Sequence, residues 1–151
     1  MEIPSSLQNI DRSLFSKFPY LMRVEKPWGH EILFTPPELP YTGKVLCLKA
    51  HKESSLQAHD KKQESWYLLS GKVVMIREDK DGKLHEINMQ SGVGYTIYIG
   101  QRHRFYARRN SEILEVSTPE IGNTFRFEDD YGRPTETEEL RAEPNRGWDN
   151  K

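Results

Sequence analysis

The sequence predicts an all-β fold, an antiparallel sandwich or barrel, and two observations support this prediction. From residue 21 to about residue 119, short runs rich in valine, isoleucine, leucine and tyrosine alternate with turn residues, a pattern typical of strands. No long helical segment separates the runs, so consecutive strands are expected to pair with one another. The runs are HEILFT, KVLCLKA, SWYLLSG, KVVMIRE, KLHEINM, GYTIYIG, HRFYARR and EILEVST.

Three segments follow from the same pass along the chain. Residues 1–20 form a predicted helical arm, because apolar residues recur there at steps of three and four and Pro19 is a stop signal. Its apolar stripe is expected to dock on the body of the protein or on a second subunit. Residues 21–134 hold the strands, with a hairpin turn in EDKDGK at 78–83, where Asp-Gly supplies the positive φ angles of a tight turn. Residues 135–151 are polar and predict an extended tail, with at most a short helix near 135–141. The apolar stripe of the arm consists of Ile3, Leu7, Ile10, Leu14 and Phe18.

Composition limits the classes of function. The chain has 151 residues, 35% of them hydrophobic and 30% charged, which is enough for one globular domain with a core. A net charge of −1 argues against partners recognised by bulk charge, so neither nucleic acid nor a membrane surface is expected. The single cysteine, Cys47, excludes an intrachain disulfide. The sequence has neither a signal-peptide pattern nor an apolar stretch of 18 residues, so we expect a soluble cytoplasmic protein.

One group of polar residues has the composition of a metal site. Gln57 and His59 are two residues apart, so on a strand both side chains point from the same face. A turn after His59 brings the chain back beside itself, so that Glu64 can approach His59. His103 begins a later strand just after Gly100, and in a barrel that strand could lie beside the first pair.

Two imidazoles, a carboxylate and an amide oxygen form a mixed ligand set that suits Zn²⁺, Mn²⁺, Fe²⁺, Co²⁺ or Ni²⁺. The absence of cysteine ligands favours a working site with open positions over a closed structural zinc site. Spacing by itself leaves a second interpretation open, in which these side chains are ordinary surface polarity at the edge of a sheet.

The segment from residue 51 to residue 71 resembles the first motif of the cupins. That motif runs Gly, five residues, His-x-His, three or four residues, Glu, six residues, Gly. His59, Glu64 and Gly71 match at the right spacings, while His51 stands in the first glycine place and Gln57 in the first histidine place.

A second segment resembles the second cupin motif, which runs Gly, five residues, Pro-x-Gly, two residues, His, three residues, Asn. Gly92, Gly100 and His103 match, while Tyr98 replaces the proline and Ala107 the asparagine. These departures fall on turn and packing positions and leave the four ligand candidates in place.

Within the cupins the sequence is most similar to the mannose-6-phosphate isomerase domain, which forms the C-terminal part of bifunctional bacterial enzymes that also carry a mannose-1-phosphate guanylyltransferase. Glutamine in place of the first motif histidine is typical of that group. The resemblance covers about residues 22–134 and does not include the nucleotidyltransferase. The segments that carry it are RVEKPWGHE at 23–31, SLQAHDKKQESWYLLSG at 55–71, IYIGQRHRF at 97–105 and RFEDDYGR at 126–133.

This resemblance implies a double-stranded β-helix, or jelly roll, and a divalent transition metal, with Zn²⁺ expected first. The ligands it implies are Gln57, His59, Glu64 and His103. It also implies aldose–ketose isomerisation of a sugar phosphate, in which a base removes a proton next to a carbonyl and the metal stabilises the developing oxyanion.

The remaining roles in such a reaction have several candidates. Arginine suits a phosphate because its planar fork donates two hydrogen bonds at once. Arg133 is the first candidate for that role, with Arg102 and Arg104 behind it. For the general base the sequence leaves three side chains open, which are Lys61, Glu115 and Tyr131.

Two other functions remain open at this stage. The chain could be a metal-containing module that binds a carbohydrate without catalysis, or an Fe²⁺-dependent oxygenase, which the two-histidine, one-carboxylate set permits. In each case the expected partner is a small molecule. For the isomerase and for the binding module, that molecule is a sugar or sugar phosphate. A homodimer is expected, because cupins often pair and the arm offers an apolar face.

Overall fold

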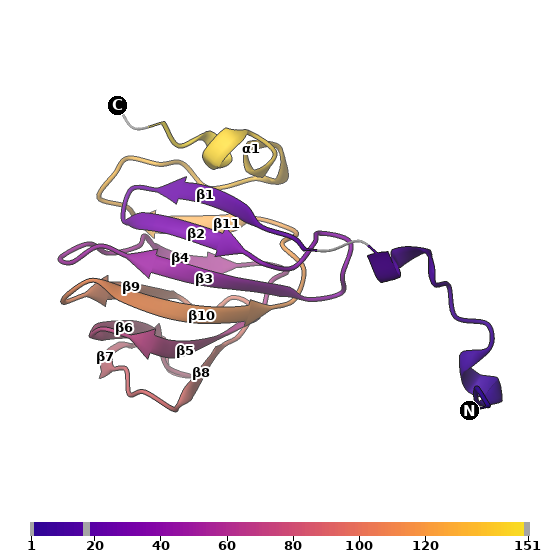
Figure 1. Ribbon diagram of the computed structural model, residues 1–151. Coiled ribbons are helices and arrows are strands. Elements are labelled where there is room, and N and C mark those ends of the chain that lie inside the picture. The colour runs from indigo at the N-terminus through magenta and orange to yellow at the C-terminus, as the bar shows by residue number, and fades with distance from the viewer. Residues whose placement is uncertain (1, 17–18, 150–151) are drawn as a thin grey trace.

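The computed structural model describes residues 2–16 and 19–149, and in these ranges eleven strands form two facing sheets (Figure 1). Every pairing between named strands is antiparallel, which confirms the all-β prediction. The six-stranded sheet has the order β1 (Met22–Lys26), β2 (Gly29–Leu33), β3 (Thr42–Leu48), β10 (Ser111–Ser117), β5 (Glu64–Ser70) and β8 (Gly94–Ile97). The five-stranded sheet has the order β11 (Thr124–Glu128), β4 (Leu56–His59), β9 (His103–Ala107), β6 (Val73–Glu78) and β7 (Leu84–Asn88).

The core lies between the two sheets, and strand alternation fills it. In β10, for example, Ser111, Ile113, Glu115 and Ser117 are buried while Glu112 and Val116 are exposed. Toward one end of the sandwich the interior is apolar. Toward the other end polar and charged side chains replace the apolar ones, and that end holds the candidate site. The apolar core consists of Trp28, Leu46, Leu48, Trp66, Leu68, Val73, Met75, Met89, Ile97, Phe105, Ala107 and Ile113.

Two glycines stand at positions where the backbone requires this residue. The turn at 78–83 joins β6 to β7 as predicted, with Gly82 at φ +80° and the Asp79 carboxylate accepting hydrogen bonds from two backbone amides. Gly29 ends the KPWG segment where β2 lies against β3. A Cβ atom on Gly29 would stand 1.9 Å from the carbonyl oxygen of Cys47, so the close approach of these strands requires glycine.

The N-terminal arm projects away from the barrel (Figure 1). It contains two short 3₁₀ turns, Ser5–Leu7 and Ser13–Ser16, where the sequence pattern predicted a continuous helix. The physical reason is that a helix of this length is marginal unless its apolar face is packed, and here the apolar side chains of the described residues are about half exposed. Phe18, which belongs to the predicted stripe, lies outside the described residues.

The C-terminal segment returns onto the barrel. Glu136 forms an antiparallel bridge with Thr124 of β11, and α1 (Glu138–Arg141) follows, with Thr137 as its N-cap. A 3₁₀ turn at Pro144–Gly147 then lies against β1, where the Asn145 side chain accepts a hydrogen bond from the backbone of Glu25. The segment expected as an extended tail therefore covers one end of the sandwich (Figure 1).

None of the helices in the two described ranges has the length and apolar character that crossing a membrane requires.

Candidate metal site

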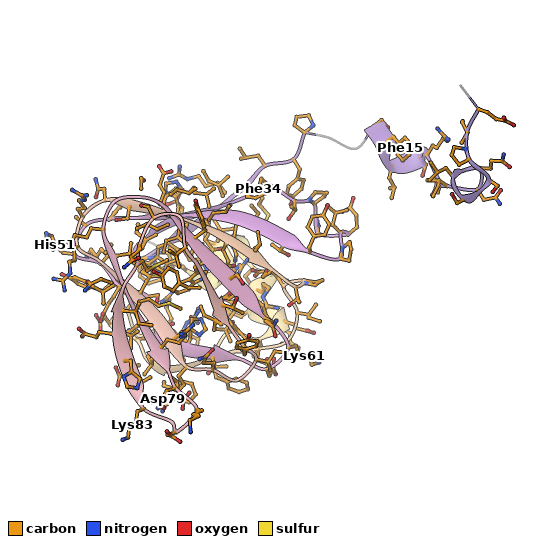
Figure 2. All side chains as sticks on the ribbon, turned by 90° about the horizontal axis from the view of Figure 1, so that it is seen from below. Phe15, Phe34, His51, Lys61, Asp79 and Lys83 are labelled. Carbon is orange, nitrogen blue, oxygen red and sulfur yellow. The ribbon has the colours of Figure 1, made fainter. Side chains whose placement is uncertain are left out.

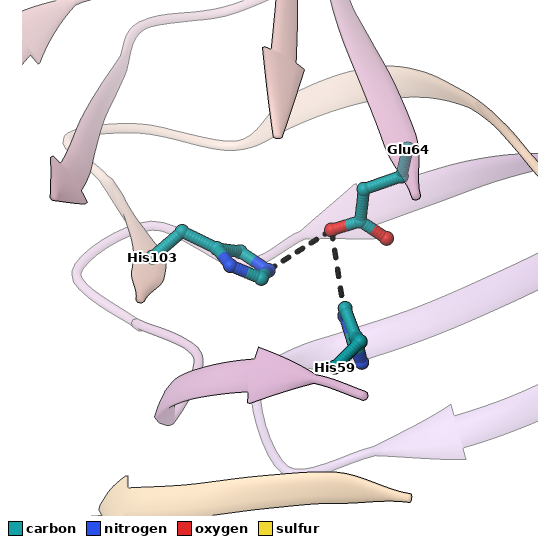
Figure 3. A group of neighbouring side chains, drawn as sticks. All are labelled: His59, Glu64 and His103. Carbon is teal, nitrogen blue, oxygen red and sulfur yellow. Dashed lines mark ion pairs between the residues drawn. The ribbon is translucent and has the colours of Figure 1, made fainter. Parts of the chain in front are cut away.

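His59, Glu64 and His103 meet inside the barrel, and all three are buried (Figure 3). His59 ends β4, Glu64 begins β5 and His103 begins β9, so the group draws on both sheets. One potential ligand atom from each residue lies within 4.8 Å of the others. The structure thus brings together three of the four side chains that the sequence proposed as ligands.

The contacts within this group are close without being hydrogen bonds. Glu64 Oε1 lies 2.9 Å from His103 Nε2 and 3.6 Å from His59 Nε2. Neither Nε2 atom has a hydrogen-bond partner, and nor does Glu64 Oε1, although all three atoms are shielded from solvent. Buried polar atoms without a partner are uncommon and call for an explanation.

The other nitrogen of each ring is held by the protein. His103 Nδ1 donates to the carbonyl oxygen of Gln101 at 2.8 Å, so in the neutral ring Nε2 carries the lone pair. His59 Nδ1 lies 3.1 Å from Thr124 Oγ1, which fixes the orientation of that ring. An imidazole lone pair aimed at a carboxylate oxygen is repulsive unless a cation lies between them. The triad therefore has the donor set and the outer-sphere support of a divalent transition-metal site.

Gln57 lies in position to complement the triad. It is two residues before His59 on β4, and it stands directly opposite His103 in the register of β4 and β9. Its side chain lines a cavity that His59 also lines, and its Oε1 accepts a hydrogen bond of 2.8 Å from Ser55 Oγ.

A buried lysine ties Glu64 to two further carboxylates. Lys62 Nζ lies 2.8 Å from Glu64 Oε2, 3.1 Å from Glu115 Oε2 and 3.2 Å from Glu120 Oε1. Burial by itself would raise the pKa of Glu64, but the ammonium group of Lys62 is the main cause that holds it well below its usual range. Burial lowers the pKa of His59, and Glu64 opposes this only in part. A charged carboxylate and a neutral imidazole are the forms that bind metals.

Glu115 is the second acidic group at the site. Trp66 Nε1 donates to its Oε1 at 3.0 Å and Lys62 donates to its Oε2. Burial raises the pKa of Glu115, and the negative charge of Glu64 raises it further. A buried carboxyl with a raised pKa beside a metal site is a candidate for proton transfer.

Two arginines contribute positive charge to the cavity wall. Arg126 of β11 stands opposite Gln57 in the register with β4, and its side chain is 7% exposed. Its Nε has no hydrogen-bond partner, whereas its other nitrogens contact Glu136 and the carbonyl of Pro134. Arg133 also lines the cavity, and Asp129 holds it through Nε and Nη2.

The remaining candidates from the sequence lie elsewhere. Lys61 is exposed at the rim of the barrel and does not line the cavity, whereas the adjacent Lys62 does (Figure 2). The Tyr131 hydroxyl donates to the carbonyl of Glu53 at 3.0 Å, outside the cavity lining. Arg102 pairs with Glu78, and Arg104 is held by the Ser54 carbonyl and Glu128, so neither lines the cavity.

Sequence reasoning missed four residues that shape the site. Thr124 and Arg126 share one face of β11, which strand alternation could have shown, whereas Lys62 precedes β5 and lies where that alternation does not apply. Arg146 had no local signal, because it reaches the site only through the folding of the C-terminal segment.

The cavity is small in this structure. Its volume is about 50 Å³, and Arg146, one of its lining residues, pairs with Glu31, Glu120 and Glu136. Such a space holds a metal ion and one or two waters, but it is far smaller than the roughly 300–1,000 Å³ of ordinary small-molecule sites.

Comparison with solved structures shows which fold the chain has. No protein-family model and no curated protein matches the chain. Among solved structures, oxalate decarboxylase from Bacillus subtilis at pH 4.6 is 21% identical with a TM-score of 0.61, and the match covers 71% of this chain and 30% of that one. The formate complex of oxalate decarboxylase from Lactobacillus farciminis is 23% identical with a TM-score of 0.61, and covers 71% and 34%.

A third structure is closer to this chain in length. KdgF from Halomonas sp. is 13% identical with a TM-score of 0.55, and the match covers 66% of this chain and 87% of that one. The chain spans only about a third of the length of the oxalate decarboxylases it matches. At these identities the likeness shows the fold alone, which is the cupin jelly roll that the sequence resemblance implied.

Proposed function

We propose that this cupin-fold chain is a metal-dependent enzyme that isomerises a small sugar phosphate between its aldose and ketose forms, with mannose 6-phosphate and fructose 6-phosphate as the first pair to test. One observation carries the proposal. The unpartnered nitrogens of His59 and His103 converge on Glu64, and His59 also lines an adjacent cavity whose wall contains the buried Lys62–Glu115 pair and several arginines.

The proposed ligands are His59, Glu64 and His103, with Gln57 as a fourth. Zn²⁺ is the first metal to test, and Mn²⁺, Fe²⁺, Co²⁺ and Ni²⁺ suit the same donors. One of the similar oxalate decarboxylases is described by its Mn(II) centers, which supports testing Mn²⁺ alongside Zn²⁺. A metal bound here would act as a Lewis acid toward a substrate oxygen.

Isomerisation needs a base that takes a proton from the carbon beside the carbonyl and returns it to the neighbouring carbon. Glu115 suits this role, because it lines the cavity and burial raises the pKa of its carboxyl above the usual value. Lys62 holds Glu115 and Glu64 at fixed positions through one ammonium group. The roles predicted for Lys61 and Tyr131 stay predictions, and both side chains lie outside the cavity lining.

The phosphate is assigned to Arg126 and Arg133. Arg126 offers a buried Nε that has no partner, beside the strand that carries His59. Arg133 adds a second guanidinium on the same wall, currently held by Asp129. Two planar forks on one wall match the geometry of a phosphate, which accepts paired hydrogen bonds.

The alternatives share the metal and differ in the rest of the cavity. An Fe²⁺ oxygenase needs the same triad but has no need of a lysine–glutamate pair or of paired arginines. A module that binds a carbohydrate without catalysis would use the arginines but would not need Glu115. The location expected from the sequence, the cytoplasm, agrees with a phosphorylated substrate and stays a prediction.

The test is conversion of fructose 6-phosphate to mannose 6-phosphate by the metal-loaded protein, with Glu115→Gln compared against Glu112→Gln. Both residues lie on β10, but Glu112 is exposed on the opposite face. The proposal predicts turnover by wild type and by Glu112→Gln and a loss of at least about 100-fold in Glu115→Gln with metal retained. Saturable binding of the sugar phosphate without turnover would favour the binding module, and O₂ consumption with Fe²⁺ would favour the oxygenase. Either outcome would overturn the isomerase.

A further inference from the structure

The N-terminal arm, residues 2–16, presents apolar side chains that nothing covers. Ile3, Leu7, Ile10 and Leu14 are each close to half exposed, and Phe15 is 60% exposed. Each hydrogen bond or ring contact that the structure gives for residues 2–16 joins two residues of the arm itself. Figure 2 shows Phe15 well away from the barrel.

An apolar groove opens on the barrel where the arm begins. Its volume is about 260 Å³, and its walls are mainly apolar side chains from four separate parts of the chain. This is below the size of most small-molecule sites and closer to that of a few side chains. The walls include Tyr20, Met22, Leu33, Pro37, Pro119 and Ile121.

The exposed surface of the chain is larger than that of a compact monomer. It amounts to 9344 Å², whereas a compact chain of 17.7 kDa is expected to expose about 7,900 Å². The excess of about 1,400 Å² exceeds the roughly 800 Å² that each partner buries in a standard stable interface. The arm and the groove together therefore provide enough surface for a stable dimer.

We propose that two copies of this chain exchange arms, so that the arm of each lies in the groove of the other. Tyr20 and Met22 line the groove and also form the root of the arm, which places the root of each arm beside the groove it leaves. A two-fold axis near these roots would let each arm cross directly to the partner's groove, and the same contact would form twice. Burial would give the amphipathic stripe the packing that a continuous helix requires.

The arm exchange also concerns the candidate metal site, although it does not depend on the proposed isomerase function. Glu120, Arg141 and Arg146 line both the groove and the site cavity. An arm from the partner would therefore lie beside the part of the C-terminal segment that lines the cavity.

The first test is the mass of the full-length protein by sedimentation equilibrium across a concentration series. Wild type is expected to be a dimer, and Leu7→Asp together with Leu14→Asp should raise the dissociation constant by about 30-fold or more. Gln8→Asp, in the same arm, is the matched control and should leave association unchanged. The double variant should keep a cooperative thermal transition, at a lower temperature than the wild-type dimer, which shows that the lost association does not come from unfolding. A monomeric wild type, or a dimer insensitive to both arm substitutions, would overturn the proposal.

The second test separates exchange from an arm that folds back on its own barrel. In a Cys47→Ser background, chains carrying Leu14→Cys are mixed with chains carrying Ile121→Cys and then oxidised. A disulfide-linked pair of one chain of each kind is the expected result. If a single chain carrying both substitutions gives only an internally cross-linked monomer, the arm occupies its own groove and the exchange is wrong. Absence of any cross-link would also contradict it.

Discussion

His103 Nε2 and Glu64 Oε1 lie 2.9 Å apart inside the barrel, and no hydrogen bond joins them. The other ring nitrogen of His103, Nδ1, donates a hydrogen bond to the carbonyl of Gln101. The free lone pair therefore faces a carboxylate that the ammonium group of Lys62 keeps charged against the effect of burial. Two electron-rich atoms held this close in a dry interior are stable only with a cation between them, and the predictions for the site follow from this.

Thr124→Val should weaken metal binding without removing a ligand. Thr124 Oγ1 contacts His59 Nδ1 and orients the ring, and partners of this kind are typically worth about 10–100-fold in metal affinity. The measurement is a competition titration with a chelating dye. Thr118→Val, which alters an exposed threonine, should keep wild-type affinity. Equal affinities in the two variants would mean that Thr124 does not support the site.

Lys62→Met should destabilise the fold far more than Lys61→Met. Lys62 is the ammonium group shared by Glu64, Glu115 and Glu120, and removing one partner from a buried ion group costs about 3–5 kcal/mol. The exposed Lys61 should change the free energy of unfolding by no more than about 0.5 kcal/mol. Urea unfolding of both variants measures the difference, and similar losses would contradict the arrangement of the cavity.

Acid should weaken the fold through Glu31. Burial acts to raise the pKa of Glu31, but Lys26, Lys44 and Arg146 lower it from 4.5 to about 2. The folded state thus binds fewer protons than the unfolded state between these values, so the contribution is complete above pH 4.5 and is lost as the pH falls toward 2. Urea unfolding at several pH values should show this slope in wild type. In Glu31→Gln the free energy of unfolding should fall less steeply as the pH falls. An unchanged dependence on pH would show that Glu31 is not its cause.

Arg146→Gln should loosen the C-terminal segment. Its guanidinium pairs with Glu31, Glu120 and Glu136, and without it these buried carboxylates lose a shared partner, at a cost of about 3 kcal/mol. Hydrogen exchange in residues 137–148 should quicken while the core strands stay protected. Arg108→Gln, on an exposed turn, is the control and should leave exchange in that segment unchanged.

The sheets could be predicted from sequence because their determinants are local. Strand alternation and turn glycines specify which residues face inward, and the buried positions of β10 follow that alternation. His59, Glu64 and His103 could be placed together for the same reason, since each stands at the end or the beginning of a strand. The resemblance to cupins added the pairing of segments that are distant in sequence.

The parts that sequence could not give depend on loops and on long-range packing. The turn between β4 and β5 interrupts the strand period, so local pattern did not decide which of Lys61 and Lys62 faces the cavity. Arg146 reaches the carboxylates only because residues with positive φ turn the C-terminal segment back over the barrel. The arm reads as a helix in sequence, yet a helix in isolation lacks the packing that would stabilise it.

The most direct test of the central claim is the metal content of the purified protein by elemental analysis, in wild type, His103→Ala and His85→Ala. His85 is exposed and pairs with Asp79 away from the site, so it controls for adventitious binding by histidine. The account predicts about one equivalent of a divalent transition metal in wild type and in His85→Ala, and a loss of at least about tenfold in His103→Ala. A wild-type protein that stays metal-free after incubation with Zn²⁺, Mn²⁺, Fe²⁺, Co²⁺ and Ni²⁺ would contradict it.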